Sequence, residues 1–149
     1  GDLLQINGEP DANYKMVDDI KMDTYNNVSA TWLPIKNFTG KLDGDNHYIA
    51  DLNLKTTESS VGLFSELGEK SEVKNLVIAS PKVEIESQNS TIGTLAASAI
   101  SSSIENVHVY NAEMSGTSSA TVGGIIGQAA LNTTTIPPTV FSALNSPLA

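Results

Sequence analysis

The sequence predicts an all-β protein, a right-handed parallel β-helix (β-solenoid) of about four to five coils with short capping segments at both ends. Three observations favour this fold. Two short phrases recur along the chain at intervals of 24 to 32 residues. The residues around them are strong strand formers, and helical apolar spacing does not extend beyond one turn. Repetition at such intervals is typical of a chain that winds back over itself.

The first phrase is apolar-Gly-x-apolar, and it occurs three times. It reads "VGLF" from Val61, "IGTL" from Ile92 and "VGGI" from Val122, so the copies are 31 and 30 residues apart. A glycine at a fixed place in each copy indicates a backbone turn or the close approach of two chain segments. We therefore expect the three copies to lie one above another.

The second phrase is apolar-x-Asp/Asn-apolar-x-apolar. Its four copies begin at Val17, Ile49, Val73 and Ile104, and their third positions are Asp19, Asp51, Asn75 and Asn106. The apolar positions change parity within the phrase, which a straight strand cannot satisfy because its side chains alternate between two faces. Asn and Asp tolerate the left-handed conformation best among residues with a Cβ. The phrase therefore predicts a bend between two short strands.

Stacking explains why the phrases repeat. One coil cannot bury its apolar face alone, and the next coil covers it. Equivalent strands then pair in parallel about 4.8 Å apart, with Val, Ile and Leu facing inward. The right hand follows the strong preference of parallel crossovers. A leucine-rich horseshoe and a β-sandwich are the alternatives. The predicted divisions are a lead-in over residues 1–13, the β-helix over 14–128 and an uncharged tail or linker over 129–149.

Composition narrows the possible functions. The chain has 149 residues, a net charge of −9, no cysteine, and eight basic residues that are all lysine. Disulfides and thiolate metal sites are therefore excluded, and nucleic-acid binding is disfavoured. No apolar run approaches the length of a membrane span, so membrane insertion is not expected. Because the chain begins with Gly rather than Met, we expect a processed or excised piece.

The segment "TWLPIKNFTGKLDGDNHYIADLNLKTTESSVGLFSEL", residues 31–67, resembles the lead-in and first unit of bacterial GLUG-repeat proteins. The matching positions are Trp32, Pro34, Ile35, Phe38, Gly40, Asp43, Gly44, His47, Ile49, Val61, Gly62, Leu63 and Phe64. The second unit departs from the pattern at "TLAASAISSS". The resemblance spans roughly residues 14–128. It implies export, a β-solenoid and a modular parent, either an adhesin-like surface protein or a chain with a zinc metallopeptidase that cleaves immunoglobulin A.

No catalytic residue is predicted. Zinc peptidase chemistry needs His-Glu-x-x-His or an equivalent cluster, whereas His47 and His108 are the chain's two histidines and neither lies in such a motif. A Gly-x-Ser-x-Gly nucleophile elbow is also missing from the sequence. We expect both histidines at the surface or at bends.

Paired carboxylates are the remaining candidates for chemistry. Asp43 with Asp45, or Asp18 with Asp19, would be the pair that glycoside hydrolysis requires. For "DGD" we expect instead a turn in which Asp caps the backbone and Gly takes a positive φ. No metal or cofactor site is predicted, although calcium near Asp43 and Asp45 is left open.

Aromatic and acidic residues receive structural roles. Trp32 is expected to cap the first coil. Tyr48 and Tyr110 lie near equivalent bends, where they would be neighbours. The acids Glu66, Glu69 and Glu72 are expected in a solvated turn.

We therefore expect a non-catalytic structural or interaction module of a secreted or cell-surface bacterial protein, with an adhesion or spacer role. The alternative is a carbohydrate-binding or carbohydrate-active β-helix domain, and a third is an accessory domain of an immunoglobulin-cleaving protease. The expected partner is a host or cell-surface protein or glycan, with no nucleic acid.

Overall fold

The computed structural model describes residues 3, 5–22, 32–54, 59–85, 91–116, 121–123, 125–130 and 134–135. Short strands dominate this part of the chain. In order, the elements are α1 (Gln5–Gly8), β1 (Asn13–Lys15), β2 (Ile20–Lys21), β3 (Lys41–Ala50), β4 (Ser60–Val61), β5 (Phe64–Leu67), β6 (Glu72–Ala79), β7 (Lys82–Ile85), β8 (Thr91–Gly93), β9 (Ala96–Ile100), β10 (Ser103–Tyr110), β11 (Glu113–Gly116), β12 (Thr121–Gly123), β13 (Ile126–Ala130) and β14 (Thr134–Thr135).

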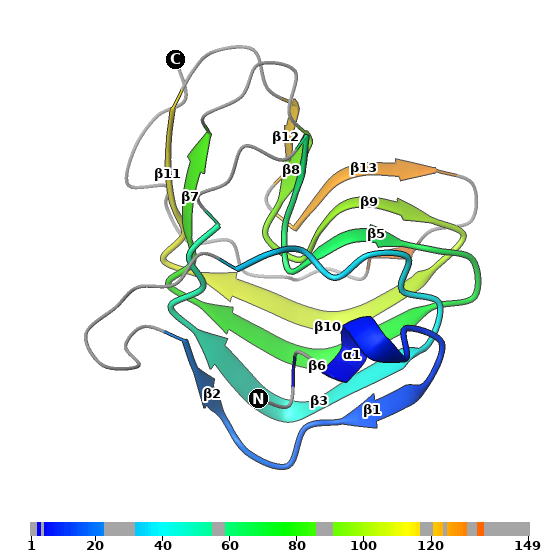
Figure 1. Ribbon diagram of the computed structural model, residues 1–149. Coiled ribbons are helices and arrows are strands. Elements are labelled where there is room, and N and C mark those ends of the chain that lie inside the picture. Colours follow the sequence, from blue (N-terminus) through cyan, green and yellow to red (C-terminus); the bar gives the residue numbers. More distant parts are fainter. Residues whose placement is uncertain are drawn as a thin grey trace.

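The strands form four sheets, and every strand pair is parallel. The largest, called here the main sheet, has the order β1-β3-β6-β10-β14, with β2 also paired to β3. The others are β11-β7, β12-β8-β4 and β13-β9-β5. Figure 1 shows β3, β6 and β10 stacked along one side, with the shorter sheets stacked in the same order above them. The predicted all-β class and the parallel pairing are confirmed.

From Lys41 onward, the starts of successive strands in the main sheet are 31 residues apart. Lys41 pairs with Glu72, Glu72 with Ser103, and Ser103 with Thr134. The first sequence phrase follows the same rule, because Val61 pairs with Ile92 on the next strand of its sheet. We use "repeat" for each passage through the sheets: residues 13–38, 41–67, 72–100 and 103–130.

The predicted alignment of the four copies of the second phrase is correct only for the last two copies. Val73 pairs with Ile104, and the strands run in parallel from there to Ile78 and Val109. Ile49, however, pairs with Ile78 and not with Val73. It also pairs with Ile20 on its other side, so the predicted alignment of Val17 with Ile49 is wrong by three residues. The copy at Ile49 lies at a different bend from the copy at Val73, which pairs with Leu42, and β3 also carries a register shift between Asp43 and His47.

Most of the predicted bends are present. Asp51, Asn75 and Asn106 have φ values of 63°, 56° and 53°, in the left-handed region. Between β1 and β2 the chain bends at Asp18, and Asp19 is not among the positive-φ residues of the described chain, so the left-handed conformation predicted at Asp19 is wrong. The structure adds bends at residue types that do not favour this conformation: Lys70, Ser80 and Ser101.

The interior is filled by columns of apolar side chains from successive repeats. Three of these columns are Leu42–Val73–Ile104, Ile49–Ile78–Val109 and Leu76–Val107, all buried. On the opposite side, Phe64 pairs with Ala96, and its ring lies 4.8 Å from the ring of Phe38. Large side chains in one repeat therefore pack over small ones in the next, which accommodates the departure "TLAASAISSS" within β9.

The N-terminal end of the stack is covered by α1 and the first repeat. Leu3 and Ile6 are buried in the same core cluster as Trp32. Trp32 is 5% exposed, and its Nε1 donates a hydrogen bond to the Leu63 carbonyl at 3.0 Å. The indole is thus satisfied, and Trp32, itself part of the first repeat, bonds the second repeat and is buried in the core.

The predicted divisions of the chain stay a prediction. Of the tail assigned to 129–149, the structure describes the end of β13 and the strand β14, which pairs with β10. Residues 131–133 and 136–149 lie outside the described part. In the part that is described, no helix has the length and apolar character needed to cross a membrane.

Candidate functional site

The outer face of the main sheet carries a column of amide side chains at the bend. Asn106 Nδ2 donates hydrogen bonds to Asn75 Oδ1 at 2.8 Å and to Asn46 Oδ1 at 3.5 Å. Asn75 Nδ2 reaches Asp43 Oδ1 at 3.4 Å. The column therefore links the second, third and fourth repeats through side chains in addition to the backbone ladder.

Beside the amide column, aromatic rings lie on β10. His108 Nε2 lies 2.8 Å from Asn106 Oδ1, and the imidazole stacks on Tyr110 with a centroid distance of 6.2 Å. Because an amide oxygen can only accept, Nε2 carries the proton in neutral His108. Nδ1 is then a buried acceptor without a partner among the described residues. The expectation that Tyr48 and Tyr110 are neighbours is wrong. Tyr48 shares its register position with Val77 and His108, and not with Tyr110.

The "LDGDN" segment forms a bulge, in which Gly44, Asp45 and Asn46 lie opposite the single residue Asn75. Asp43 Oδ1 accepts a hydrogen bond from the Asp45 backbone N–H at 2.9 Å, as predicted for a turn capped by Asp. The positive φ angles fall on Asp45 and Asn46 rather than on the glycine. Gly44 is required for space, because a Cβ there would lie 2.3 Å from the Asn75 carbonyl oxygen.

Asp43 is held as a carboxylate by this turn. Its pKa is lowered first by the hydrogen bond from Asp45 N–H, against the opposing effect of desolvation. The Asn75 amide and the positive charges of Lys74 and Lys15 lower the pKa further. Both of these hydrogen bonds fall on Asp43 Oδ1, so one oxygen of this carboxylate is engaged by two protein donors. Asp43 and Asp45 also lie outside the group of metal-ligating side chains found in the described residues.

That group consists of Asp18, Asp19 and His47, whose ligand atoms all lie within 4.8 Å of one another. Asp18 and Asp19 precede β2, whereas His47 lies in the middle of β3. His47 Nδ1 is 3.2 Å from Asp19 Oδ1, and the Tyr48 backbone N–H donates to the same oxygen at 3.0 Å. The cluster therefore joins the first two repeats.

Sequence reasoning considered all three residues but did not bring them together. With Ile20 aligned on Ile49, as the structure has it, Asp18 falls opposite His47 and Asp19 opposite Tyr48. The predicted alignment on Val17 displaced the two aspartates from His47 by three positions. The correct alignment is obtained when "DIK" (19–21) is compared with "YIA" (48–50) on the central isoleucine of each.

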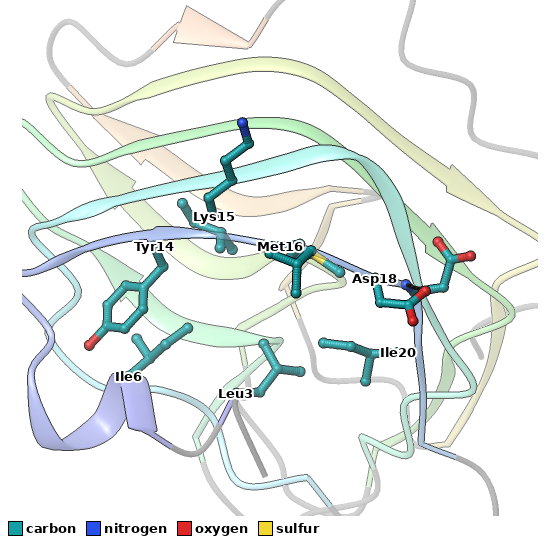
Figure 2. Close-up of a pocket in the computed structure, with 10 residues that line it drawn as sticks. Leu3, Ile6, Tyr14, Lys15, Met16, Asp18 and Ile20 are labelled. Carbon is teal, nitrogen blue, oxygen red and sulfur yellow. Dashed lines mark hydrogen bonds between the residues drawn. The ribbon is translucent and has the colours of Figure 1, made fainter.

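A pocket of about 180 Å³ lies next to this cluster at the N-terminal end of the stack. The side chains of Leu3, Ile6, Tyr14 and Ile20 converge on it, while the Lys15 amino group points away (Figure 2). Asp18 lies at its edge, and neighbouring Val17 is 86% exposed.

The phenol of Tyr14 closes one side of the pocket. Its hydroxyl donates to the Glu9 carbonyl oxygen at 2.7 Å. The pKa of Tyr14 is raised, first by burial and then by the carboxylates of Glu9 and Asp11. The phenol is therefore a neutral hydrogen-bond donor at physiological pH.

Comparison with known proteins identifies the chain's family. Residues 1–111 match the family model described as the M26 IgA1-specific metallo-endopeptidase N-terminal region. Among curated proteins, halomucin of Haloquadratum walsbyi is 33% identical over 90 residues, which cover 55% of this chain. The chain spans about 1% of the length of halomucin. No solved structure matches. The matched region includes the amide column, the aromatic pair and the Asp18–Asp19–His47 cluster, and the chain belongs to the family of the M26 IgA1-specific metallo-endopeptidase N-terminal region.

Proposed function

We propose that the chain is a segment of right-handed parallel β-helix that serves as a non-catalytic structural and interaction module of a secreted or cell-surface bacterial protein. The observation that carries this proposal is the 31-residue register of the main sheet, from Lys41 through Glu72 and Ser103 to Thr134. Each such repeat adds one strand spacing of about 4.8 Å to the stack. A parent with more repeats would extend in the same direction, which suits a spacer.

The family supports a surface-associated setting. The matched model is named for the N-terminal region of a metallo-endopeptidase, which supports a position of this segment within a larger chain. The similarity to halomucin and the resemblance of residues 31–67 to GLUG repeats favour the same setting. The net charge of −9 gives an acidic exterior, which suits solubility outside the cell.

The outer face of the main sheet is the surface on which we place an interaction role. Its columns align because β6 and β10 keep one register on both sides of the bend, and β3 joins them on each side of its bulge. Asp43, Lys74 and Glu105 form a column of alternating charge beside the amide column. A flat surface of fixed amides and charges suits the recognition of another protein or a glycan through hydrogen bonds.

A carbohydrate-binding role is the second candidate. Tyr110 is 37% exposed and stacks on His108, which in turn contacts the amide column at Asn106. An exposed ring beside fixed amide groups is an arrangement that can stack on a sugar and bond its hydroxyls. The replacement Tyr110→Ala separates the two candidates, since it should abolish glycan binding and leave a spacer unaffected.

The experiment is a screen of the purified chain on glycan arrays and on arrays of host matrix proteins, with immunoglobulin A1 included. Binding to an arrayed ligand that is lost in the Tyr110→Ala variant supports the carbohydrate role. Binding that the Tyr110→Ala replacement leaves intact supports protein adhesion. The absence of binding on both arrays leaves the spacer role. Cleavage of immunoglobulin A1 or of a polysaccharide by the purified chain would refute the non-catalytic proposal.

A further inference from the structure

We propose that Asp18, Asp19 and His47 form a binding site for one divalent transition-metal ion of the Zn²⁺ class, which ties the first repeat to the second. The cluster supplies two carboxylates and one imidazole, with all ligand atoms within 4.8 Å of one another. Bonds of about 2.0–2.2 Å to Zn²⁺ place tetrahedral ligand atoms roughly 3.4 Å apart. Small side-chain rotations close the remaining gap.

The imidazole ligand determines which class of cation the site prefers. An exposed pair of aspartates alone would attract any cation weakly, and Ca²⁺ and Mg²⁺ prefer oxygen ligands only. A nitrogen ligand from a different repeat changes the donor set to one that suits Zn²⁺ and its neighbours in the first transition row. His47 is well placed for this role, because its side chain is only 27% exposed and already faces Asp19 at 3.2 Å.

The backbone fixes both carboxylates without using all of their oxygen atoms. Asp18 Oδ1 accepts the Asp19 N–H at 2.8 Å, and Asp19 Oδ1 accepts the Tyr48 N–H at 3.0 Å. Within the described residues, the second oxygen of each carboxylate has no hydrogen-bond partner, and His47 Nδ1, whose contact is Asp19 Oδ1, is the nitrogen that faces the carboxylates. These atoms can bind a metal ion while the backbone bonds keep the carboxylates in place.

Charge also favours a bound cation. In the described part of the chain, no lysine forms a salt bridge with Asp18 or Asp19, whereas Lys15 pairs with Asp45 and Lys41 with Glu72. Two adjacent carboxylates without a lysine partner repel each other, and a divalent ion removes this repulsion.

The position of the cluster between β2 and β3 gives a bound ion a structural role. β2 is held to β3 by two residue pairs, Ile20 with Ile49 and Lys21 with Ala50. It also lies at the end of the stack, where the first repeat has a neighbour on one side only. An ion that binds the folded chain alone would stabilise this terminal repeat by mass action.

The test uses the untagged chain and zinc chloride in isothermal titration calorimetry. We expect saturable binding of one Zn²⁺ per chain, at least tenfold weakening in His47→Gln and in Asp19→Asn, and no change in the matched control His108→Gln. Circular dichroism of each variant checks folding. Excess Ca²⁺ should not displace the Zn²⁺. Equal weakening in His47→Gln and His108→Gln, or the absence of saturable binding up to millimolar Zn²⁺, would overturn the proposal.

A second measurement locates the ion independently of the variants. Substoichiometric Mn²⁺ broadens the NMR signals of nearby amides because it is paramagnetic. We expect broadening centred on the amides of Asp19, His47 and Tyr48. Broadening centred on the bulge at Asp43–Asn46 would place the ion elsewhere and contradict the site.

Discussion

Asn106 Nδ2 donates a hydrogen bond to Asn75 Oδ1 at 2.8 Å, although the two residues are 31 positions apart in the chain. Both residues lie in the left-handed region, with φ values of 53° and 56°. Each asparagine therefore does two things: it permits the bend in its own strand, and its amide binds the neighbouring repeat. Substitutions can separate the two contributions.

Asn106→Ala should destabilise the protein more than Asn106→Gly. Both variants lose the amide hydrogen bond, but alanine also has to adopt the left-handed conformation, which costs a residue with a Cβ about 1–2 kcal/mol. Glycine adopts it freely. Urea unfolding followed by circular dichroism measures both values. Alanine usually surpasses glycine inside strands, so a result in which Asn106→Ala is the more stable variant would show that this φ is not required.

Gly62→Ala should be strongly destabilising. A Cβ at this position would lie 2.4 Å from the carbonyl oxygen of Gly93 in the next repeat, and backbone atoms cannot move aside as a flexible side chain can. We expect a loss of about 1–3 kcal/mol in the free energy of unfolding. The control is Gly8→Ala, where a Cβ meets nothing within 4 Å. Equal effects of the two substitutions would argue against the close stacking of these repeats.

Ile78→Ala should cost about 2–5 kcal/mol, because Ile78 is fully buried between Ile49 and Val109 and its loss leaves a cavity in the interior. Val17→Ala serves as the control, since Val17 is 86% exposed and its truncation should change stability by no more than about 0.5 kcal/mol. The free energy of unfolding in urea measures both. A similar loss in the two variants would show that the apolar columns do not form the core.

Protonation of Asp43 at low pH should destabilise the bulge. Its pKa is lowered in the folded protein, so the folded state binds a proton at Asp43 less tightly than the unfolded chain does. The stability that this carboxylate contributes is therefore present above the ordinary aspartate pKa of about 4 and is lost as the pH falls through the lowered value.

Asp43→Asn provides the matched variant, since its amide oxygen can still accept the Asp45 N–H. The stability difference between the natural chain and Asp43→Asn should shrink from pH 6 to pH 2, and a ¹³C NMR titration should find the Asp43 carboxyl below its ordinary pKa. A constant stability difference over this range, with an ordinary pKa for Asp43, would contradict the proposed turn.

The sequence was sufficient to predict the parts of the fold in which successive repeats have equal length. Val73 and Ile104 were aligned correctly because β6 and β10 pair in one register on both sides of the bend, with one asparagine on each strand. The same reasoning failed for Ile49, because its copy of the phrase lies at a different bend: Val73 pairs with Leu42, and Ile49 pairs with Ile78. In addition, Asp45 and Asn46 are extra residues in β3. A fixed period cannot reveal an insertion that the chain absorbs as a bulge.

The candidate metal site was missed because the phrase at Val17 was aligned on Ile49. Asp19 and His47 lie in different repeats, and they meet only in the register that pairs Ile20 with Ile49. The bends at Lys70 and Ser101 were missed for another reason. Their residue types carry no preference for the left-handed conformation, and the stacking of consecutive repeats at equivalent positions imposes it, since the Lys70 N–H bonds the Ser101 carbonyl at 3.0 Å.

The stacking of consecutive repeats is tested most directly by NMR nuclear Overhauser effects between the backbones of β6 and β10 in the isotope-labelled chain. The structure predicts contacts that run in one direction, from Val73 beside Ile104 to Ile78 beside Val109. Contacts that instead join Val73 to Val109, as in an antiparallel pair, or the absence of any contact between these strands, would contradict the account.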